Sequence, residues 1–156
     1  MNELFNIKDR VVVLTGGTGV LGKAIALYLA KQGAKVVVMG RRVEAGEAIV
    51  KQIREEGGEG MFLVTDVMNQ AVVEQNLADV LAQYGRVDAL LNAAGGNMPG
   101  ATIAPTGTFF DLKAEEFQRV LDLNLTGTVI PTQVFLRPMV EQGKGCVFNF
   151  SSMAAF

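Results

Sequence analysis

Four glycines follow an apolar run near the N-terminus of the chain. Residues 11–14 are Val-Val-Val-Leu, Thr15 comes next, and Gly16, Gly17, Gly19 and Gly22 follow before a helical stretch. Glycine lets the backbone turn tightly and approach a ligand, and the free N–H groups of a helix start stabilise negative charge. The turn therefore predicts a pyrophosphate site with contacts at Gly16, Thr18, Gly19, Val20 and Leu21. A tight strand-to-helix turn without a ligand is the alternative.

Two arginines, Arg41 and Arg42, follow the second apolar run. In a dinucleotide-binding unit an acidic residue at this place hydrogen-bonds the ribose 2′-hydroxyl of NAD. Here that acid is absent, and two guanidinium groups pair well with a 2′-phosphate. The pair predicts NADP as the cofactor, with NAD as the alternative; it can also be a solvated pair at the start of a helix.

The elements that must position these residues alternate between strands and helices. Short Val/Ile/Leu runs predict strands, and amphipathic stretches predict helices. Gly33, Gly57 and Gly85 follow the first three helices, as C-terminal caps do. With right-handed crossovers this order predicts an α/β fold, a doubly wound parallel sheet of the Rossmann type. The predicted strands are 10–15, 35–39, 60–65, 87–92 and 146–150, and the predicted helices are 21–32, 43–56 and 69–84.

The remaining chain predicts a loop over 95–107 and a long helical region over about 113–142. Pro131 and Pro138 should kink or divide that region, because each removes a backbone donor. The sequence shows neither an internal repeat nor a linker. Residues 1–156 are therefore expected to form a single dinucleotide-binding domain.

Composition excludes several classes of function. The net charge is −2, which gives no electrostatic reason to expect nucleic acid or an anionic membrane as partner. With a single cysteine and no histidine we expect neither an internal disulfide nor a zinc site. No apolar run reaches the length of a membrane span, and the first residues lack a signal sequence, so a cytoplasmic protein is expected.

Several motifs at the strand ends occur together in one known family. Thr15-Gly16 opens the turn, Asp66-Val67 ends the third strand, and residues 92–95 (Asn-Ala-Ala-Gly) end the fourth. Asn124 lies in the long helical region, and Ser151-Ser152 follow the fifth strand. On these residues the chain resembles the short-chain dehydrogenase/reductase family over essentially its whole length.

The resemblance implies a role for each motif. Asp66 would accept a hydrogen bond from the adenine amino group, with Val67 against the ring, although Asp66 can also simply cap a strand end. The residues that would line the cofactor cleft are Asn92, Ala93, Ala94 and Gly95. Asn124 resembles the family's catalytic Asn, which holds a helix irregularity and a water of the proton relay; the alternative is a satisfied buried amide. Ser152 resembles the residue that hydrogen-bonds the substrate carbonyl or alcohol.

Two positions depart from the family's classical branch. Its middle glycine usually stands where this chain has Val20, and a second Asn is common where this chain has Ala93. The glycine spacing is nearer the extended branch, which includes nucleotide-sugar epimerases. Asn124 and the motif that starts at Asn92 are classical, and they favour the classical branch over an epimerase.

The family's general acid/base, a Tyr with a Lys four residues later, is expected about 13 residues after the active Ser. The sequence ends at Phe156, and neither Tyr28 nor Tyr84 has a Lys at that spacing. We therefore expect the chain to be the N-terminal part of a longer catalytic domain, incomplete at its C-terminus and inactive alone. Its fifth strand would be a bare apolar edge. A non-catalytic dinucleotide-binding fragment or truncated paralogue is the alternative.

Within the family, residues 94–102, 109–112 and 123–133 look most like sugar-acid oxidoreductases of the mannonate/fructuronate type. The resemblance implies a hydride transfer between NAD(P) and a secondary alcohol or ketone. Asn97 either contacts a polyol or caps its own loop. The resemblance also implies a homodimer or homotetramer built through the long helix.

Overall fold

The computed structural model describes residues 6–151, which form one parallel sheet with the strand order β3-β2-β1-β4-β5. Every pairing is parallel, and Val12 of the first strand lies opposite Val36 on one side and Ala89 on the other. The predicted doubly wound α/β fold is confirmed. The chain order reverses between β1 and β4, where such sheets bind ligands. The strands are β1 (Val11–Thr15), β2 (Lys35–Gly40), β3 (Glu59–Val64), β4 (Ala89–Asn92) and β5 (Cys146–Asn149).

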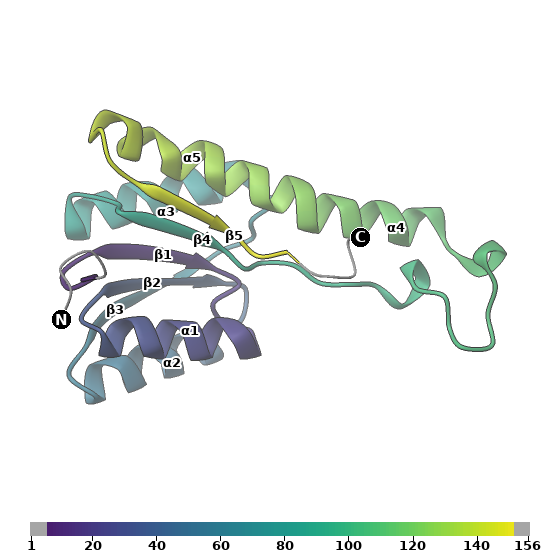
Figure 1. Cartoon of the computed structure of the whole chain (residues 1–156), viewed down its shortest axis with the longest axis horizontal. Coiled ribbons are helices and arrows are strands. Elements are labelled where there is room, and N and C mark those ends of the chain that lie inside the picture. The colour runs from purple at the N-terminus through teal and green to yellow at the C-terminus, as the bar shows by residue number, and fades with distance from the viewer. Residues whose placement is uncertain (1–5, 152–156) are drawn as a thin grey trace.

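Helices cover both faces of the sheet. Helices α1 (Val20–Lys31) and α2 (Val43–Glu55) lie on one face, and α3 (Gln70–Tyr84) and α5 (Gly127–Glu141) lie on the other (Figure 1). Alternate residues of a strand point to opposite faces, so β1 supplies Val12 to the first helix layer and Val13 to the second. A strand buried on both faces must be apolar throughout, which explains the valine runs.

The observed bounds differ from the predicted ones by at most two residues. The glycines that were expected to end the helices adopt positive φ: +87° at Gly33, +82° at Gly57 and +69° at Gly85. The chain can leave each helix in the left-handed conformation there because glycine has no Cβ. The glycines at the helix ends and the apolar runs of the strands were sufficient to predict these elements.

The long helical region is interrupted, but not at its prolines. It consists of α4 (Ala114–Leu121), a π-helical turn η4 (Asp122–Thr126) and α5. Pro131 and Pro138 lie inside α5 and do not divide the region, so that half of the prediction is wrong; the kink stays a prediction. Both prolines are buried, and the packing of this helix face outweighs the backbone donors that they remove.

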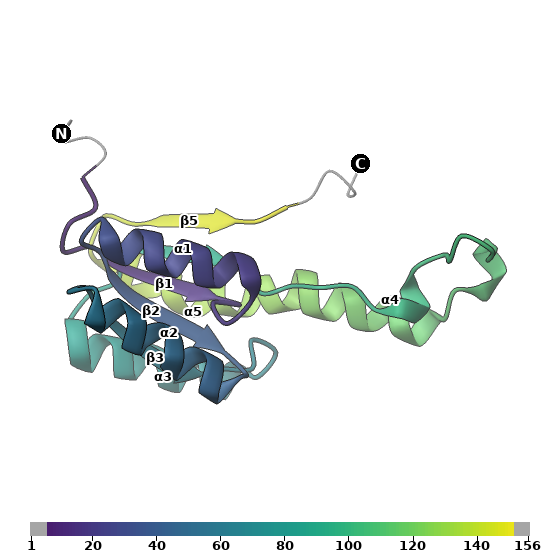
Figure 2. The ribbon, with the colours of Figure 1, turned by 90° about the horizontal axis from the view of Figure 1, so that it is seen from below.

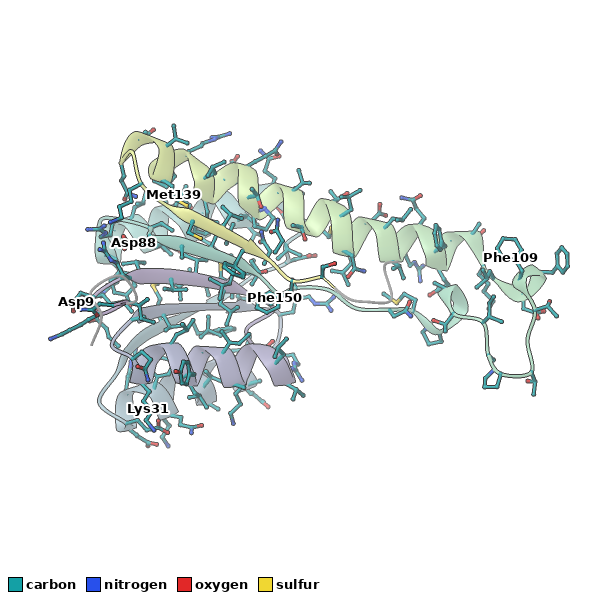
Figure 3. The ribbon with its side chains drawn as sticks, in the orientation of Figure 1. Asp9, Lys31, Asp88, Phe109, Met139 and Phe150 are labelled. Atoms are coloured by element: carbon teal, nitrogen blue, oxygen red, sulfur yellow. The ribbon has the colours of Figure 1, made fainter. Side chains whose placement is uncertain are left out.

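Part of the chain extends beyond the sheet. The segment from Asn97 to Thr126 contains α4 and two short 3₁₀ turns, η2 (Pro99–Ala101) and η3 (Phe109–Asp111). Figures 1 and 2 show it as an arm, and Figure 3 places Phe109, 72% exposed, at its tip. The predicted loop over 95–107 is confirmed, with η2 as its regular part. Strand β5 is an edge strand in the described residues, and its Phe148 is 62% exposed.

Two absences concern the described residues. Within residues 6–151 no helix combines the length and the apolar composition that a membrane span requires. The same part of the chain contains no group of three or more His, Cys, Asp or Glu side chains that could hold a metal ion.

Asp88 joins the amino ends of the strands. Its carboxylate accepts hydrogen bonds from the backbone N–H of Val11 at 2.9 Å and from Arg86 at 2.5 Å, and it pairs with Arg10 at 3.3 Å. Burial alone would raise the pKa of Asp88, but the hydrogen bonds and positive charges of its partners outweigh burial, so its pKa lies below the ordinary value. Figure 3 shows Asp88 at the opposite end of the sheet from Phe150.

We expect Asp88→Asn to lower the free energy of unfolding at pH 7 by about 1–3 kcal/mol, because charge-assisted hydrogen bonds are lost. A lowered folded-state pKa stabilises the protein above the ordinary carboxyl pKa of about 3.9 and ceases to do so as the pH falls through the folded value. The difference between wild type and variant should therefore shrink as the pH falls below about 4. Urea unfolding at several pH values measures it.

Glu47→Gln is the matched control, since Glu47 is exposed on α2. It should change the free energy of unfolding by less than about 0.5 kcal/mol. An Asp88→Asn variant with the same small effect at neutral pH would show that this cluster does not stabilise the sheet.

Candidate functional site

A cavity of about 310 Å³ opens at the carboxyl ends of the strands. It lies at the reversal of strand order between β1 and β4, and its lining residues are the last residue of β2, residues of the segments that follow β1 to β4, and Leu123 of η4. The lining residues are Gly16, Thr18, Gly19, Gly40, Arg41, Arg42, Thr65, Asp66, Val67, Ala93, Ala94, Gly95 and Leu123.

The glycine turn after β1 packs backbone directly against backbone. Gly16 has φ +65°, and a Cβ there would lie 2.5 Å from the carbonyl oxygen of Ala93. A Cβ on Gly22 would lie 2.3 Å from the carbonyl oxygen of Gly16. Real side chains do not fit at such separations, so these two positions require glycine. The turn thereby brings the start of α1 and the end of β4 to the same edge of the cavity.

The amino end of α1 has no side-chain cap. Its N-cap is Gly19, which supplies no side-chain hydrogen bond, and its first turn contains no acidic residue. The N–H groups and the positive end of the helix dipole can therefore act on an anion. Val20 is 95% exposed and Leu21 is 59% exposed, beside the cavity rather than in its lining.

Thr15 connects the turn to the opposite wall of the cavity. Its side chain is fully buried, and the hydroxyl oxygen accepts hydrogen bonds from the N–H groups of Ala93 and Ala94, each at 3.2 Å. Ala93 and Ala94 line the cavity, so Thr15 fixes their position. Thr15 was not among the predicted site residues, because a strand-end threonine has no local signal of such a role.

The two arginines differ in their surroundings. The Arg42 guanidinium donates a hydrogen bond to the backbone carbonyl of Thr18, so it is attached to the glycine turn. Arg41 is exposed and lines the cavity, where no such bond holds it among the described residues. Gly40 makes room for this arrangement, since a Cβ there would lie 2.6 Å from the Thr18 hydroxyl.

Asp66 caps the chain after β3 and also lines the cavity. One carboxylate oxygen accepts the N–H of Met68 at 3.0 Å, which is the strand-end cap considered above. Its neighbour Val67 is buried and also lines the cavity. Thr65 fixes the position of this segment by two hydrogen bonds: its hydroxyl donates to the carbonyl of Leu63 and accepts from the Asn76 amide at 2.6 Å.

Asn124 lies in the π-helical turn, as the predicted helix irregularity requires. Its amide nitrogen donates to the carbonyl oxygens of Gly96 at 2.7 Å and Val120 at 2.8 Å, and its amide oxygen accepts the Gly96 N–H at 3.1 Å. A Cβ on Gly95 would lie 2.6 Å from that amide oxygen. The Asn124 side chain is thus satisfied, and it holds the loop that follows β4.

Asn92 does not line the cavity, contrary to the prediction. It is 3% exposed, and its amide nitrogen donates to the Thr132 hydroxyl and to the Asn149 side chain, each at 2.9 Å. Strand alternation explains this direction, because consecutive residues of β4 point to opposite faces and Asn92 points to the α5 side. Its own amide oxygen has no hydrogen-bond partner among residues 6–151.

Most predicted cofactor residues line the cavity, and the exceptions are Val20, Leu21 and Asn92. Sequence reasoning missed Gly40, Thr65 and Leu123, each of which directly precedes a predicted residue. Ser152 lies outside the described residues. Asn97 donates to the Thr102 hydroxyl at 2.8 Å and accepts the N–H of Met98, so its amide caps its own loop.

Neither tyrosine lines the cavity. Tyr28 is exposed on α1. Tyr84 ends α3 beside Lys35, which begins β2, and therefore lies near the amino ends of the strands. Burial and the negative charge of Glu59 raise the pKa of Tyr84 despite the opposing charge of Arg54. It is neither placed nor tuned to act as a base in the cavity.

Comparison with known proteins matches residues 10–156 to the model of the short chain dehydrogenase family. An uncharacterized oxidoreductase of Bacillus subtilis, UxuB, is 37% identical, and the alignment covers 97% of this chain and 57% of the relative. The chain thus spans little more than half the length of this relative.

Solved structures of related proteins have the same fold. A candidate D-mannonate oxidoreductase from Haemophilus influenza, solved with bound NAD, superposes with a TM-score of 0.88 at 32% identity, covering 97% of this chain and 57% of that one. A metagenomic short-chain oxidoreductase in complex with NADP gives 0.83 at 29% identity, covering 95% of this chain and 64% of that one. The family match, which extends over nearly the whole chain, shows that this protein belongs to the short-chain dehydrogenase family.

Proposed function

We propose that the full-length protein is an oxidoreductase that transfers hydride between a nicotinamide dinucleotide and a secondary alcohol or ketone. The observation that carries the proposal is the glycine turn. It places an uncapped helix start and a close backbone contact at the strand-order reversal. The family match supports the same reaction class.

The residues present fit a dinucleotide. A pyrophosphate needs N–H donors and a wall without side chains, and the turn between Gly16 and Gly22 has both. The exposed Val20 and Leu21 supply apolar contact area beside it. At the far side of the cavity one carboxylate oxygen of Asp66, without a hydrogen-bond partner among residues 6–151, can accept from an adenine amino group, and Val67 offers an apolar surface.

We further propose NADP as the preferred dinucleotide, with NAD as the alternative. Arg41 is exposed at the cavity, and no acidic side chain stands directly after β2 to accept bonds from a ribose 2′-hydroxyl. Related structures hold either dinucleotide, so the choice depends on this chain's own residues.

The substrate class that we propose is a sugar acid or a related polyol. The support is the similarity to the Haemophilus protein, whose structure is described as that of a candidate D-mannonate oxidoreductase. Since the Asn97 amide is engaged within its own loop, we do not assign it a substrate contact.

When bound, the nicotinamide supplies the hydride acceptor or donor. This chain supplies positioning: Asn124 holds the Gly96 loop, and we propose that Ser152 hydrogen-bonds the reacting oxygen. Proton transfer needs a group of suitable pKa, and a Tyr–Lys pair elsewhere in the full-length protein is proposed for it, because Tyr28 and Tyr84 lie away from the cavity. Homo-oligomeric assembly and a cytoplasmic location remain predictions.

Two other functions make different demands. A non-catalytic dinucleotide-binding module would bind NAD(P) without turnover of any sugar acid or polyol. An extended-type epimerase would convert a nucleotide sugar without net consumption of the dinucleotide. The glycine spacing favours the epimerase, whereas the oxidoreductase relatives and Asn124 in its π turn favour hydride transfer to a separate substrate.

Gly16→Ala should raise the NAD(P) dissociation constant at least about tenfold, because the backbone of Ala93 must move away from the new Cβ. Gly85→Ala is the matched control, since Gly85 has a similar φ of +69° and nothing within 4 Å of a Cβ. Both variants should lose about 1–2 kcal/mol of stability from backbone strain, with a larger loss at Gly16. Calorimetric titration and urea unfolding measure these effects. Equal NAD(P) affinity in both variants would show that the glycine turn is not part of the dinucleotide-binding site.

Arg41→Ala should weaken NADP about tenfold or more relative to NAD, because a charge-assisted contact with the 2′-phosphate is lost. The control is Arg137→Ala on the outer face of α5, which should leave both affinities unchanged. Titration with both dinucleotides measures the ratio. If Arg41→Ala weakens the two equally, the proposed preference for NADP is wrong.

Ser152→Ala in the full-length protein should lower kcat about 100-fold or more while leaving the NAD(P) dissociation constant within about twofold, because the substrate oxygen loses a hydrogen-bond donor in the transition state. The assay follows nicotinamide absorbance with a panel of sugar acids and polyols. Wild-type protein that binds NAD(P) but turns over none of them would favour the non-catalytic module.

A further inference from the structure

One face of the long helical region carries polar side chains at every fourth position: Asn124, Thr128 and Thr132. The Thr132 hydroxyl donates to the carbonyl of Thr128 at 2.7 Å, and the Thr128 hydroxyl donates to the carbonyl of Asn124 at 2.9 Å. Residues four apart lie above one another on a helix, so the three form a ladder along one side. The ladder ends in the π-helical turn η4.

At its other end the ladder meets the strands. Asn92 of β4 donates one amide hydrogen to the Thr132 hydroxyl and the other to the side-chain oxygen of Asn149 in β5. The Thr132 proton is used on the Thr128 carbonyl, so the Asn92 atom that faces Thr132 must be a donor. The nitrogen of the Asn92 amide must therefore face Thr132. The same nitrogen faces Asn149, so Asn149 must accept with its side-chain oxygen.

The side-chain hydrogen bonds of Thr132, Thr128 and Asn124, joined by the helix backbone between them, therefore connect β5 with the loop after β4. Asn149 is followed two residues later by Ser151, and Asn124 holds both backbone groups of Gly96. Asn92 is almost fully buried, so water does not offer its amide N–H groups an alternative acceptor. Removing the Thr132 hydroxyl leaves a buried N–H without a partner, which is costly.

We infer that Thr132 and Thr128 are positioning residues that fix the end of β5, and Ser151 after it, relative to Asn124 and the Gly96 loop. The inference rests on the proposed function for its effect on turnover. Its structural part, a mechanical connection between residues 147–151 and 120–126, stands on these hydrogen bonds and on the helix backbone that joins them.

The test compares three variants of the full-length protein by hydrogen–deuterium exchange and by kinetics. Thr132→Val keeps the shape but removes the hydroxyl, so amide exchange should rise about fivefold or more in both 120–126 and 147–151. Thr132→Ser restores the hydroxyl and should return exchange to the wild-type level. Thr106→Val, in the exposed arm, is the matched control and should change neither segment.

Kinetics should separate positioning from loss of fold. Thr132→Val should lower kcat about 10- to 100-fold through misplaced groups while NAD(P) affinity stays within about twofold, and Thr132→Ser should recover most of the rate. If Thr132→Val does not fold, Thr128→Val replaces it. That variant keeps the Asn92 contact, so its faster exchange should be confined to 120–126.

Unchanged exchange in both segments of the folded valine variants would overturn the inference, as would a serine variant as impaired as the valine variant. Wild-type protein without turnover on any substrate counts against the proposed function and not against the ladder, because exchange decides the ladder by itself.

Discussion

The separation between β1 and β4 at their carboxyl ends is the constraint on which the site depends. The strands are hydrogen-bonded neighbours, and just beyond them Gly16 approaches Ala93 so closely that no side chain fits between. Thr15 uses its buried hydroxyl to bind the N–H groups of Ala93 and Ala94 at the same place. A wider separation would break both contacts, and the walls of the cavity would no longer meet at one edge.

The close contact between Gly16 and Ala93 can be maintained because the sheet that carries both residues is packed on both faces. Strands β1 and β2 are buried on both faces between two helix layers, and the ion pairs of Asp88 join the opposite ends of the strands. Side chains in such an interior pack densely and transmit displacement instead of absorbing it. Residues at the carboxyl ends can therefore be held at hydrogen-bond precision by partners that are far away in sequence.

The sequence predicted those features of the fold that depend on residues close together in the chain. The valine runs of β1 and β2, the glycines at helix ends and the turn between Thr15 and Gly22 each carry their signal within a few residues, and the fold followed from them. Contacts between distant segments carry no such signal. Asn92 was expected in the cavity, but it points to the α5 face of the sheet, where its amide contacts Thr132, forty positions away. The prolines of α5 misled for the same reason, since packing against the sheet overrides their local effect.

The π-helical turn has a consequence for how this region tolerates changes in length. Each residue of a helix advances the direction of side chains by about 100°, so a π turn acts as one extra residue that resets the phase between the helices on either side. Deleting a residue from 122–126 could restore a regular helix, but α4 would then rotate relative to α5. Phe117 would no longer project from the side it now occupies, while Thr128 and Thr132 would keep theirs. Insertions and deletions should accordingly be better tolerated in the loop before α4 than in this single turn.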